Sequence, residues 1–285
     1  PILQGEIEQA IELIANAVAA GGDIAAAIKN GVAQRVALNN IKTVVVIYAE
    51  NRGFDNLYGL FPGANGIPGV NPSAVGTVTP QKDFDNSTLA SLPPTWGGFT
   101  AAGQTVTLPE ANTAGWANKP FRIDDPSGVN GTGVVVNQSV VTRDLVHKFY
   151  QNQMQINGGK NDKFVAWADS GALVMGKFDS SSSALYKLAQ QYTLADNFFQ
   201  GAFGGSFLNH QYLICACAPR HEHAPAAMRA VLDAQGQLAL KPGSPSANEG
   251  AVQVVNGGQV TPDGWSVNTS QPPYQPSGVP PAEGG

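Results

Sequence analysis

One short segment of this 285-residue chain has the hydrophobic pattern of a buried strand. Residues 43–47 are all β-branched, so an extended chain would carry such side chains on both faces. This composition suits a strand that is covered on both sides in a parallel sheet. The sequence therefore predicts a strand over residues 41–47.

Helical spacing of apolar residues appears in several other segments. An amphipathic helix is expected near the amino terminus, where apolar side chains recur on one face. Further helices follow from the same kind of pattern and from a candidate cap at Asp23, and a turn at residues 233–236 between apolar runs predicts one hairpin. The predicted helices are residues 5–20, 23–28, 142–155 and 183–192, and the predicted hairpin is residues 230–240.

The organisation of the chain is expected to be one α/β domain over residues 1–267, incomplete at its carboxyl-terminal side. Residues 62–139 are rich in Gly, Pro, Asn and Thr, and they are too long for an ordinary connection. We interpret them as a long irregular insertion beside the mouth of the site. Residues 268–285 read as a loop or disordered tail. The chain is interpreted as the amino-terminal part of a longer polypeptide, and a naturally short protein is the alternative.

Polar residues crowd the carboxyl end of the predicted strand, where open α/β sheets bind ligands. Glu50 and Asn51 offer a carboxylate and an amide carbonyl, which are hard oxygen donors suited to a divalent cation. The alternative is an ordinary polar turn in which Arg52 pairs with Asp55.

A second candidate lies at Ser206, which follows Gly204 and Gly205 and precedes apolar residues at helical spacing. A helix beginning here would present unpaired backbone N–H groups to an anion. Ser206 can be a plain N-cap or a nucleophile. Asn209 and His210 lie close by in the same predicted helix, and each can either bind substrate or serve only as a solvated or packing residue.

Three segments together resemble a known family. Residues 44–66 read VVVIYAENRGFDNLYGLFPGANG, residues 203–211 read FGGSFLNHQ, and residues 147–179 fit more loosely. The first resembles the opening motif of the bacterial phosphoesterase family, which contains acid phosphatases and phosphocholine-specific phospholipases C. The second resembles the nucleophile segment of the acid phosphatase branch.

The resemblance implies a fold and a set of roles. The fold would be α/β, with a mostly parallel central sheet flanked by helices, similar to alkaline phosphatases. Glu50 and Asn51 would ligate one divalent metal ion, and Ser206 would be the phosphorylated nucleophile that also faces the metal. His147 would contact the substrate phosphate. Without the resemblance, His147 would be read as a surface or packing residue.

The implied activity is metal-dependent hydrolysis of phosphomonoesters through a phosphoserine, as in an acid phosphatase. A phospholipase C acting on phosphodiester headgroups is the first alternative. The second is an inactive fragment, because the later Asp-Asp metal pair of the family does not occur after Asp124 and Asp125. The expected partners are small phosphorylated substrates and the rest of a longer polypeptide.

Composition narrows the class further. The chain has 42% hydrophobic and 13% charged residues, a net charge of −5 and a pI near 5.3. This acidity argues against a nucleic-acid binder. No apolar run reaches the ~20 residues of a membrane span. A periplasmic or secreted protein whose leader is absent from this chain is expected.

Two further motifs are read as non-catalytic. Cys215 and Cys217 are separated by one residue, a spacing whose geometry opposes a disulfide, so buried thiols are expected. His221 and His223 form a His-x-His pair that we interpret as a solvated loop rather than a metal clip.

Overall fold

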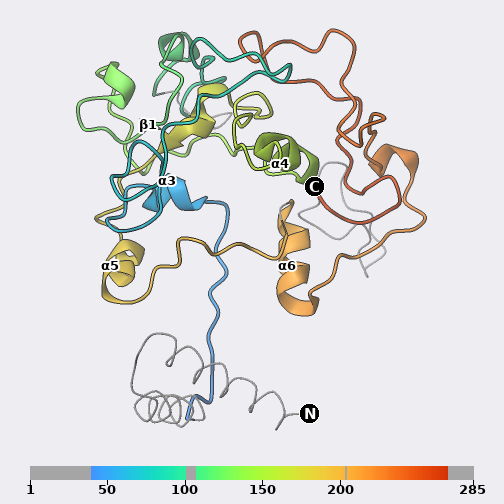
Figure 1. Cartoon of the computed structure of the whole chain (residues 1–285), viewed down its shortest axis with the longest axis horizontal. Helices are drawn as coiled ribbons and strands as arrows, with labels where there is room; N and C mark the ends of the chain where they lie inside the picture. Colours follow the sequence, from blue (N-terminus) through green and yellow to red (C-terminus); the bar gives the residue numbers. More distant parts are fainter. Residues whose placement is uncertain (1–39, 101–106, 203, 269–285) are drawn as a thin grey trace, which may run out of the picture. The chain divides into compact units, whose positions relative to one another are not determined.

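A computed structural model describes residues 40–100, 107–202 and 204–268 (Figure 1). The chain divides into two compact units, Pro1–Glu50 and Asn51–Gly285. The helices predicted over residues 5–20 and 23–28 lie outside the described residues.

The prediction of a buried strand over residues 41–47 is wrong in this structure. These residues have no regular secondary structure, and their side chains face water: Val44 is 77% exposed and Ile47 is 88% exposed. A strand is stabilised by hydrogen bonds to a neighbouring strand and by a covered face. No described segment forms strand hydrogen bonds with residues 41–47. Their β-branched side chains favour a strand, but without a neighbouring strand the segment does not form one.

The second unit contains a small parallel sheet. Strands β1 (Phe121–Arg122) and β2 (Gly176–Lys177) pair in parallel, with Phe121 opposite Gly176. The described residues form one two-stranded sheet from β1 and β2. The large central sheet that we expected is therefore not found among the described residues. The architecture is α/β, with short helices and long irregular segments around this pair.

The helices are short. The α-helices are α3 (Phe54–Tyr58), α4 (Phe149–Ile156), α5 (Ala184–Gln191) and α6 (Ser206–Cys215). The 3-10 helices are η1 (Glu110–Thr113), η2 (Val129–Gly131), η3 (Gly171–Met175) and η4 (Ala226–Met228). The prediction over residues 183–192 is confirmed: the Ser183 hydroxyl oxygen accepts the Tyr186 N–H at 3.1 Å, which caps α5.

Helix α4 begins seven residues later than the predicted start at residue 142. The segment before it is bonded to other parts of the chain, because the Val146 N–H donates to Asp169 Oδ1 at 3.2 Å. Apolar spacing indicated a helix there, but a backbone group that bonds a distant carboxylate is not available for an intrahelical bond.

The core combines buried side chains from residues 62–139 with others from residues 150–178 and from the later part of the described chain. The rings of Phe99, Trp116 and Phe121 contact one another, and the Trp116 and Phe121 centroids are 4.7 Å apart. The Leu92 N–H donates to the Trp116 carbonyl at 2.7 Å. The described parts of residues 62–139 therefore pack around buried apolar side chains, although they contain few regular elements. Other members of the core are Leu108, Ile123, Val165 and Trp167.

The hairpin predicted over residues 230–240 is confirmed. Leu232 and Leu238 form an antiparallel bridge, and the Asp233 carboxylate accepts the N–H groups of Gln235 and Gln237 at 2.9 Å. A side chain that bonds its own turn in this way fixes the reversal of the chain.

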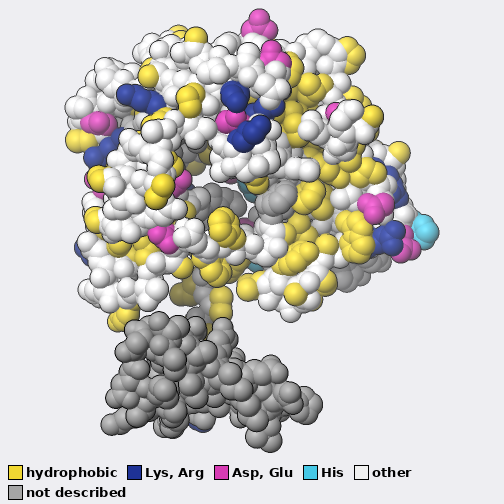
Figure 2. Space-filling model, viewed as in Figure 1, with side chains coloured by type: hydrophobic (Ala, Val, Ile, Leu, Met, Phe, Trp, Pro, Cys, Tyr) yellow, Lys and Arg dark blue, Asp and Glu magenta, His cyan; other side chains and the backbone are white. Residues whose placement is uncertain are grey.

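The face of the molecule in Figure 2 carries charged side chains that are scattered singly or in small groups, without one large basic patch. Among the described residues, no helix is both long enough and apolar enough to cross a bilayer.

Candidate active site

Ser206 is the first residue of α6, as the glycine pair before it predicted. Gly205 holds the N-cap position with an extended backbone, so Ser206 is not the N-cap. Because the first N–H groups of a helix have no partner within the helix, the Ser206 side chain lies beside backbone donors and the positive end of the helix dipole. This arrangement suits an oxygen nucleophile that approaches an anionic group.

The two glycines before Ser206 are required by close backbone contacts. Gly204 has φ +141, and a Cβ atom there would lie 2.7 Å from the Val267 carbonyl oxygen. A Cβ atom at Gly205 would lie 2.8 Å from the Asn268 carbonyl carbon. A side chain at either position would require the backbone of residues 267–268 to shift, so the turn into α6 is packed directly against these residues.

His147 lies two residues before α4 and is half-buried. Its Nδ1 atom is 2.7 Å from the Leu145 carbonyl oxygen and 3.9 Å from the Asp144 carboxylate. The contact with a carbonyl favours the tautomer in which Nδ1 carries the proton, which leaves Nε2 as the acceptor. That nitrogen is the one available for a ligand.

The segments that carry Ser206 and His147 meet at the same short stretch of chain. The Gly205 N–H donates to the Val267 carbonyl at 2.9 Å, and the Phe149 N–H donates to Asn268 Oδ1. The segments of His147 and Ser206, about sixty positions apart in the sequence, are thus both bonded to the consecutive residues 267 and 268. Sequence reasoning missed this link, since residue 268 was assigned to a loose tail.

The neighbours of Ser206 differ in exposure. Asn209 is only 7% exposed; its Nδ2 lies 3.5 Å from the Gly205 carbonyl, and its Oδ1 has no hydrogen-bond partner among the described residues. The alternative of a solvated Asn209 is therefore wrong. His210, one residue further along α6, has an exposed side chain.

Glu50 and Asn51 lie at the division between the two units, and both side chains are exposed. Arg52 next to them lies over the Phe178 ring at 4.9 Å and donates to Asn56 Oδ1 at 3.1 Å. Asn56 in turn donates to the Gly176 carbonyl at 2.9 Å. The residues just after the metal-ligand candidates are thereby attached to β2.

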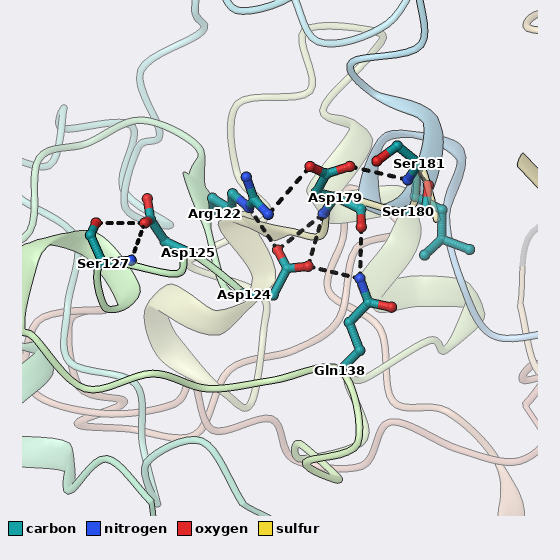
Figure 3. A network of polar contacts seen from close by, with 9 residues as sticks. Arg122, Asp124, Asp125, Ser127, Gln138, Asp179, Ser180 and Ser181 are labelled. Atoms are coloured by element: carbon teal, nitrogen blue, oxygen red, sulfur yellow. Dashed lines mark hydrogen bonds and ion pairs between the residues drawn. The ribbon is translucent and has the colours of Figure 1, made fainter. Parts of the chain in front are cut away.

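A polar network that the sequence reasoning missed lies at the carboxyl ends of β1 and β2 (Figure 3). Arg122 contacts Asp124 at 3.0 Å and Asp179 at 3.3 Å, and Gln138 donates to Asp124 at 2.8 Å. Hydrogen bonds from Ser181 hold the pKa of Asp179 below its usual range, and the Arg122 charge acts in the same direction. Asp179 and Ser181 are two positions apart, a spacing typical of a turn in which a carboxylate bonds the backbone. This spacing could have predicted the Asp179 part of the network.

This network is satisfied within itself. Both oxygens of Asp124 are engaged, because Gln138 and Arg122 bond them and the Asp179 N–H donates to the same carboxylate. Burial lowers the pKa of the neighbouring Lys177, and the Arg122 charge lowers it further. We conclude that the network fastens the two strands to residues 124–138 and does not form an open ligand site.

The expected divalent metal ion requires several hard oxygen donors. Carboxylate, amide and hydroxyl oxygens from Glu50, Asn51 and Ser206 suit a hard cation by type. No group of three or more acidic, His or Cys side chains able to hold a metal ion occurs in the described ranges. The metal site shared by Glu50, Asn51 and Ser206 therefore stays a prediction, and it needs further ligands in addition to these three residues.

The expectation of free, buried cysteines is wrong. Cys215 and Cys217 form a disulfide at the end of α6, and both are exposed. Ala216 between them has φ +50, and its N–H donates to the Tyr212 carbonyl at 3.0 Å. This left-handed residue turns the chain, so that the two Cα atoms are 5.3 Å apart, within the range that a disulfide spans.

Comparisons with known proteins agree with the motifs. Two proteins named Phospholipase C A, from Mycobacterium tuberculosis strains CDC 1551 / Oshkosh and ATCC 25618 / H37Rv, are 26% identical to the chain over 186 residues. The matched region is 63% of this chain and 30% of each relative, so the chain spans well under half of their length. No solved structure matches the chain.

The family comparison covers most of the chain, including the segments of Glu50, His147 and Ser206. The model of the Phosphoesterase family matches residues 41–269. This chain therefore belongs to the Phosphoesterase family.

Proposed function

We propose that the chain hydrolyses phosphoesters, with Ser206 as the nucleophile. The observation that carries the proposal is the position of Ser206 as the first residue of α6, after two glycines that pack directly against residues 267–268. The N–H groups of the first helical turn, which have no partner within the helix, can stabilise charge on the phosphoryl oxygens as it develops.

The reaction takes two displacements at phosphorus. In the first, Ser206 Oγ loses its proton and forms a bond to phosphorus while the bond to the leaving oxygen breaks, and that oxygen takes up a proton. In the second, a water oxygen loses a proton and forms the new bond, the Oγ–phosphorus bond breaks, Oγ takes up a proton, and phosphate leaves. The chain positions the phosphoryl group with the α6 backbone and with the His147 ring.

A divalent cation held by Glu50, Asn51, Ser206 and further oxygen ligands would neutralise phosphate charge and favour the ionised serine. The side chains of Glu50 and Asn51 are exposed, so a cation can reach them from solvent. The proposal also includes a sheet larger than the two described strands, similar to that of alkaline phosphatases, because the family resemblance implies it.

Within this activity, we propose that the substrates are phosphomonoesters, as in an acid phosphatase. The Gly204–Ser206 sequence supports this branch of the family. A phospholipase C acting on phosphodiester headgroups is the second candidate, because the curated relatives bear that name. The proposal further places the protein outside the cytoplasm; the Cys215–Cys217 disulfide supports this, since such bonds persist in oxidising compartments.

The test compares p-nitrophenyl phosphate with bis-p-nitrophenyl phosphate and phosphatidylcholine, each with and without added divalent metal. Faster release from the monoester, with phosphate on a serine peptide after acid quench, supports the phosphatase. Preference for either diester supports the phospholipase C. Binding of inorganic phosphate without turnover of any substrate would support the third possibility, an inactive fragment.

A further inference from the structure

Asn268 joins three segments that are distant in sequence. Its Oδ1 accepts the N–H of Phe149, the first residue of α4. Its Nδ2 donates to the carbonyls of Gly257 at 3.2 Å and Gly258 at 2.7 Å. The third segment is the turn into α6, because the Asn268 backbone lies against Gly205.

The side-chain amide of Asn268 is used fully. It offers two donor hydrogens and one carbonyl oxygen, and each has a partner in the structure. Its own N–H donates to the Gln259 carbonyl at 3.1 Å, so the residue cannot shift without breaking several bonds. Both donor hydrogens and the carbonyl oxygen are already bonded to backbone groups of other segments, so these contacts indicate a role in holding the segments together.

We propose that Asn268 is a positioning residue, which fixes the start of α6 and the segment of His147 in one arrangement. The inference rests on the proposed role of Ser206. His147 lies two residues before Phe149, and Ser206 directly follows Gly205, so both chemically relevant side chains are one or two residues from a contact of residues 267–268. Geometry near 1 Å matters here, because a misplaced reacting group can cost about 100-fold in rate.

The amide is the side chain that fits these partners. Asp would keep an oxygen for the Phe149 N–H but would present its other oxygen to the carbonyls of Gly257 and Gly258, which repel it. Leu has similar size and makes none of the three bonds. The two substitutions therefore separate the link to α4 from the link to the 257–258 turn.

Asn256 provides a matched control from the same turn. Its Nδ2 donates to the Ala227 carbonyl at 2.8 Å, and its Oδ1 accepts the Gly258 N–H at 3.0 Å. These bonds hold residues 256–258 together and to η4, but they do not reach α4 or α6. Loss of the Asn256 amide tests for general weakening of this part of the chain.

The experiment compares Asn268→Leu, Asn268→Asp and Asn256→Leu by two measurements: kcat and KM on a phosphomonoester, and amide hydrogen exchange at Phe149 and Gly205. We expect Asn268→Leu to lower kcat by about 10- to 100-fold, with KM within about 3-fold, and to speed exchange at both amides at least about 10-fold. Asn256→Leu should leave kcat and both amides close to wild type. Asn268→Asp should keep Phe149 protected and give an intermediate kcat.

The inference is overturned if Asn268→Leu keeps wild-type kcat, or if Asn256→Leu lowers kcat equally. If Asn268→Leu does not fold, Asn268→Asp decides alone, and a wild-type kcat in that variant overturns the proposal. If the wild-type chain hydrolyses nothing, the proposed function fails, but exchange still tests the link. In that case, unchanged protection of the Phe149 and Gly205 amides from exchange in Asn268→Leu would overturn the proposed link. Loss of protection at these two amides, with the other amides unchanged, would support the link.

Discussion

The Gly205 N–H donates to the Val267 carbonyl oxygen at 2.9 Å, which attaches the residue before the candidate nucleophile to a segment sixty-two positions away. The start of α6 is therefore determined by a tertiary contact as well as by its own sequence. The geometry of Ser206 depends on two glycines that can approach this segment closely.

Ser206→Ala should abolish phosphate release while leaving the fold intact. Loss of a covalent nucleophile typically costs several orders of magnitude in turnover. Because Gly205 and not Ser206 is the N-cap, α6 should keep its start. Turnover is measured by phosphate release, and folding by circular dichroism.

The control is Ser127→Ala, which removes an exposed hydroxyl bonded to Asp125. If Ser206→Ala retained more than about a tenth of wild-type turnover, Ser206 would not be the nucleophile, given the size of the loss expected for a covalent role.

Gly205→Ala should destabilise the protein by about 1–3 kcal/mol, because the new methyl group must displace the Asn268 backbone. Urea unfolding measures the free energy change. Gly250→Ala is the matched control, since its Cβ would meet only the Pro245 ring at an ordinary 3.6 Å. Equal stability of the two variants would contradict the close packing at the start of α6.

Ser181→Ala should raise the pKa of Asp179 towards its ordinary value. The Ser181 hydrogen bonds are the largest cause of the lowered pKa, ahead of the Arg122 charge. A carboxylate whose folded pKa is lowered stabilises the fold above its unfolded pKa of about 3.9, and this contribution is lost as pH falls through the folded pKa. The variant should therefore unfold in acid at a slightly higher pH.

Carboxyl carbon NMR titration follows the pKa of Asp179 directly. Ser87→Ala is the control, because Ser87 lowers the pKa of Asp85 in the same way and lies outside the network of Figure 3. An unchanged Asp179 titration in Ser181→Ala would show that the hydroxyl does not set this pKa.

Glu50→Gln should weaken divalent metal binding by about 10-fold or more, since a ligand oxygen loses its charge. Chelation should remove activity, and added metal should restore it. Calorimetry with Mn²⁺ measures the affinity, and the exposed Glu249→Gln serves as control. Equal affinity in both variants would remove Glu50 from the metal site.

The start of α6 was readable from the sequence because its local determinants are visible there: two glycines, then a run with helical spacing. The contact of Gly205 with Val267 was not readable. Residues 41–47 were read wrongly for the opposite reason. Their β-branched side chains favour a strand, but a strand forms only with a partner, and the partner is not encoded in the segment itself. The same limit applies to Asn268, whose contacts with Phe149 span 119 positions and leave no periodic signal. Residue types offered metal-ligand chemistry for Glu50 and Asn51 and a nucleophile or N-cap for Ser206; the resemblance implied the specific roles, which stay predictions. The link between the segments of His147 and Ser206 required the fold.

The exposed residues 43–47 have a practical consequence for handling the protein. Val44, Val45, Val46 and Ile47 are each at least 65% exposed, and this stretch contains no charge and no proline. Such segments readily add as strands to copies of themselves in concentrated solution. We therefore expect these side chains to promote association during purification, and one lysine placed among them should reduce aggregation.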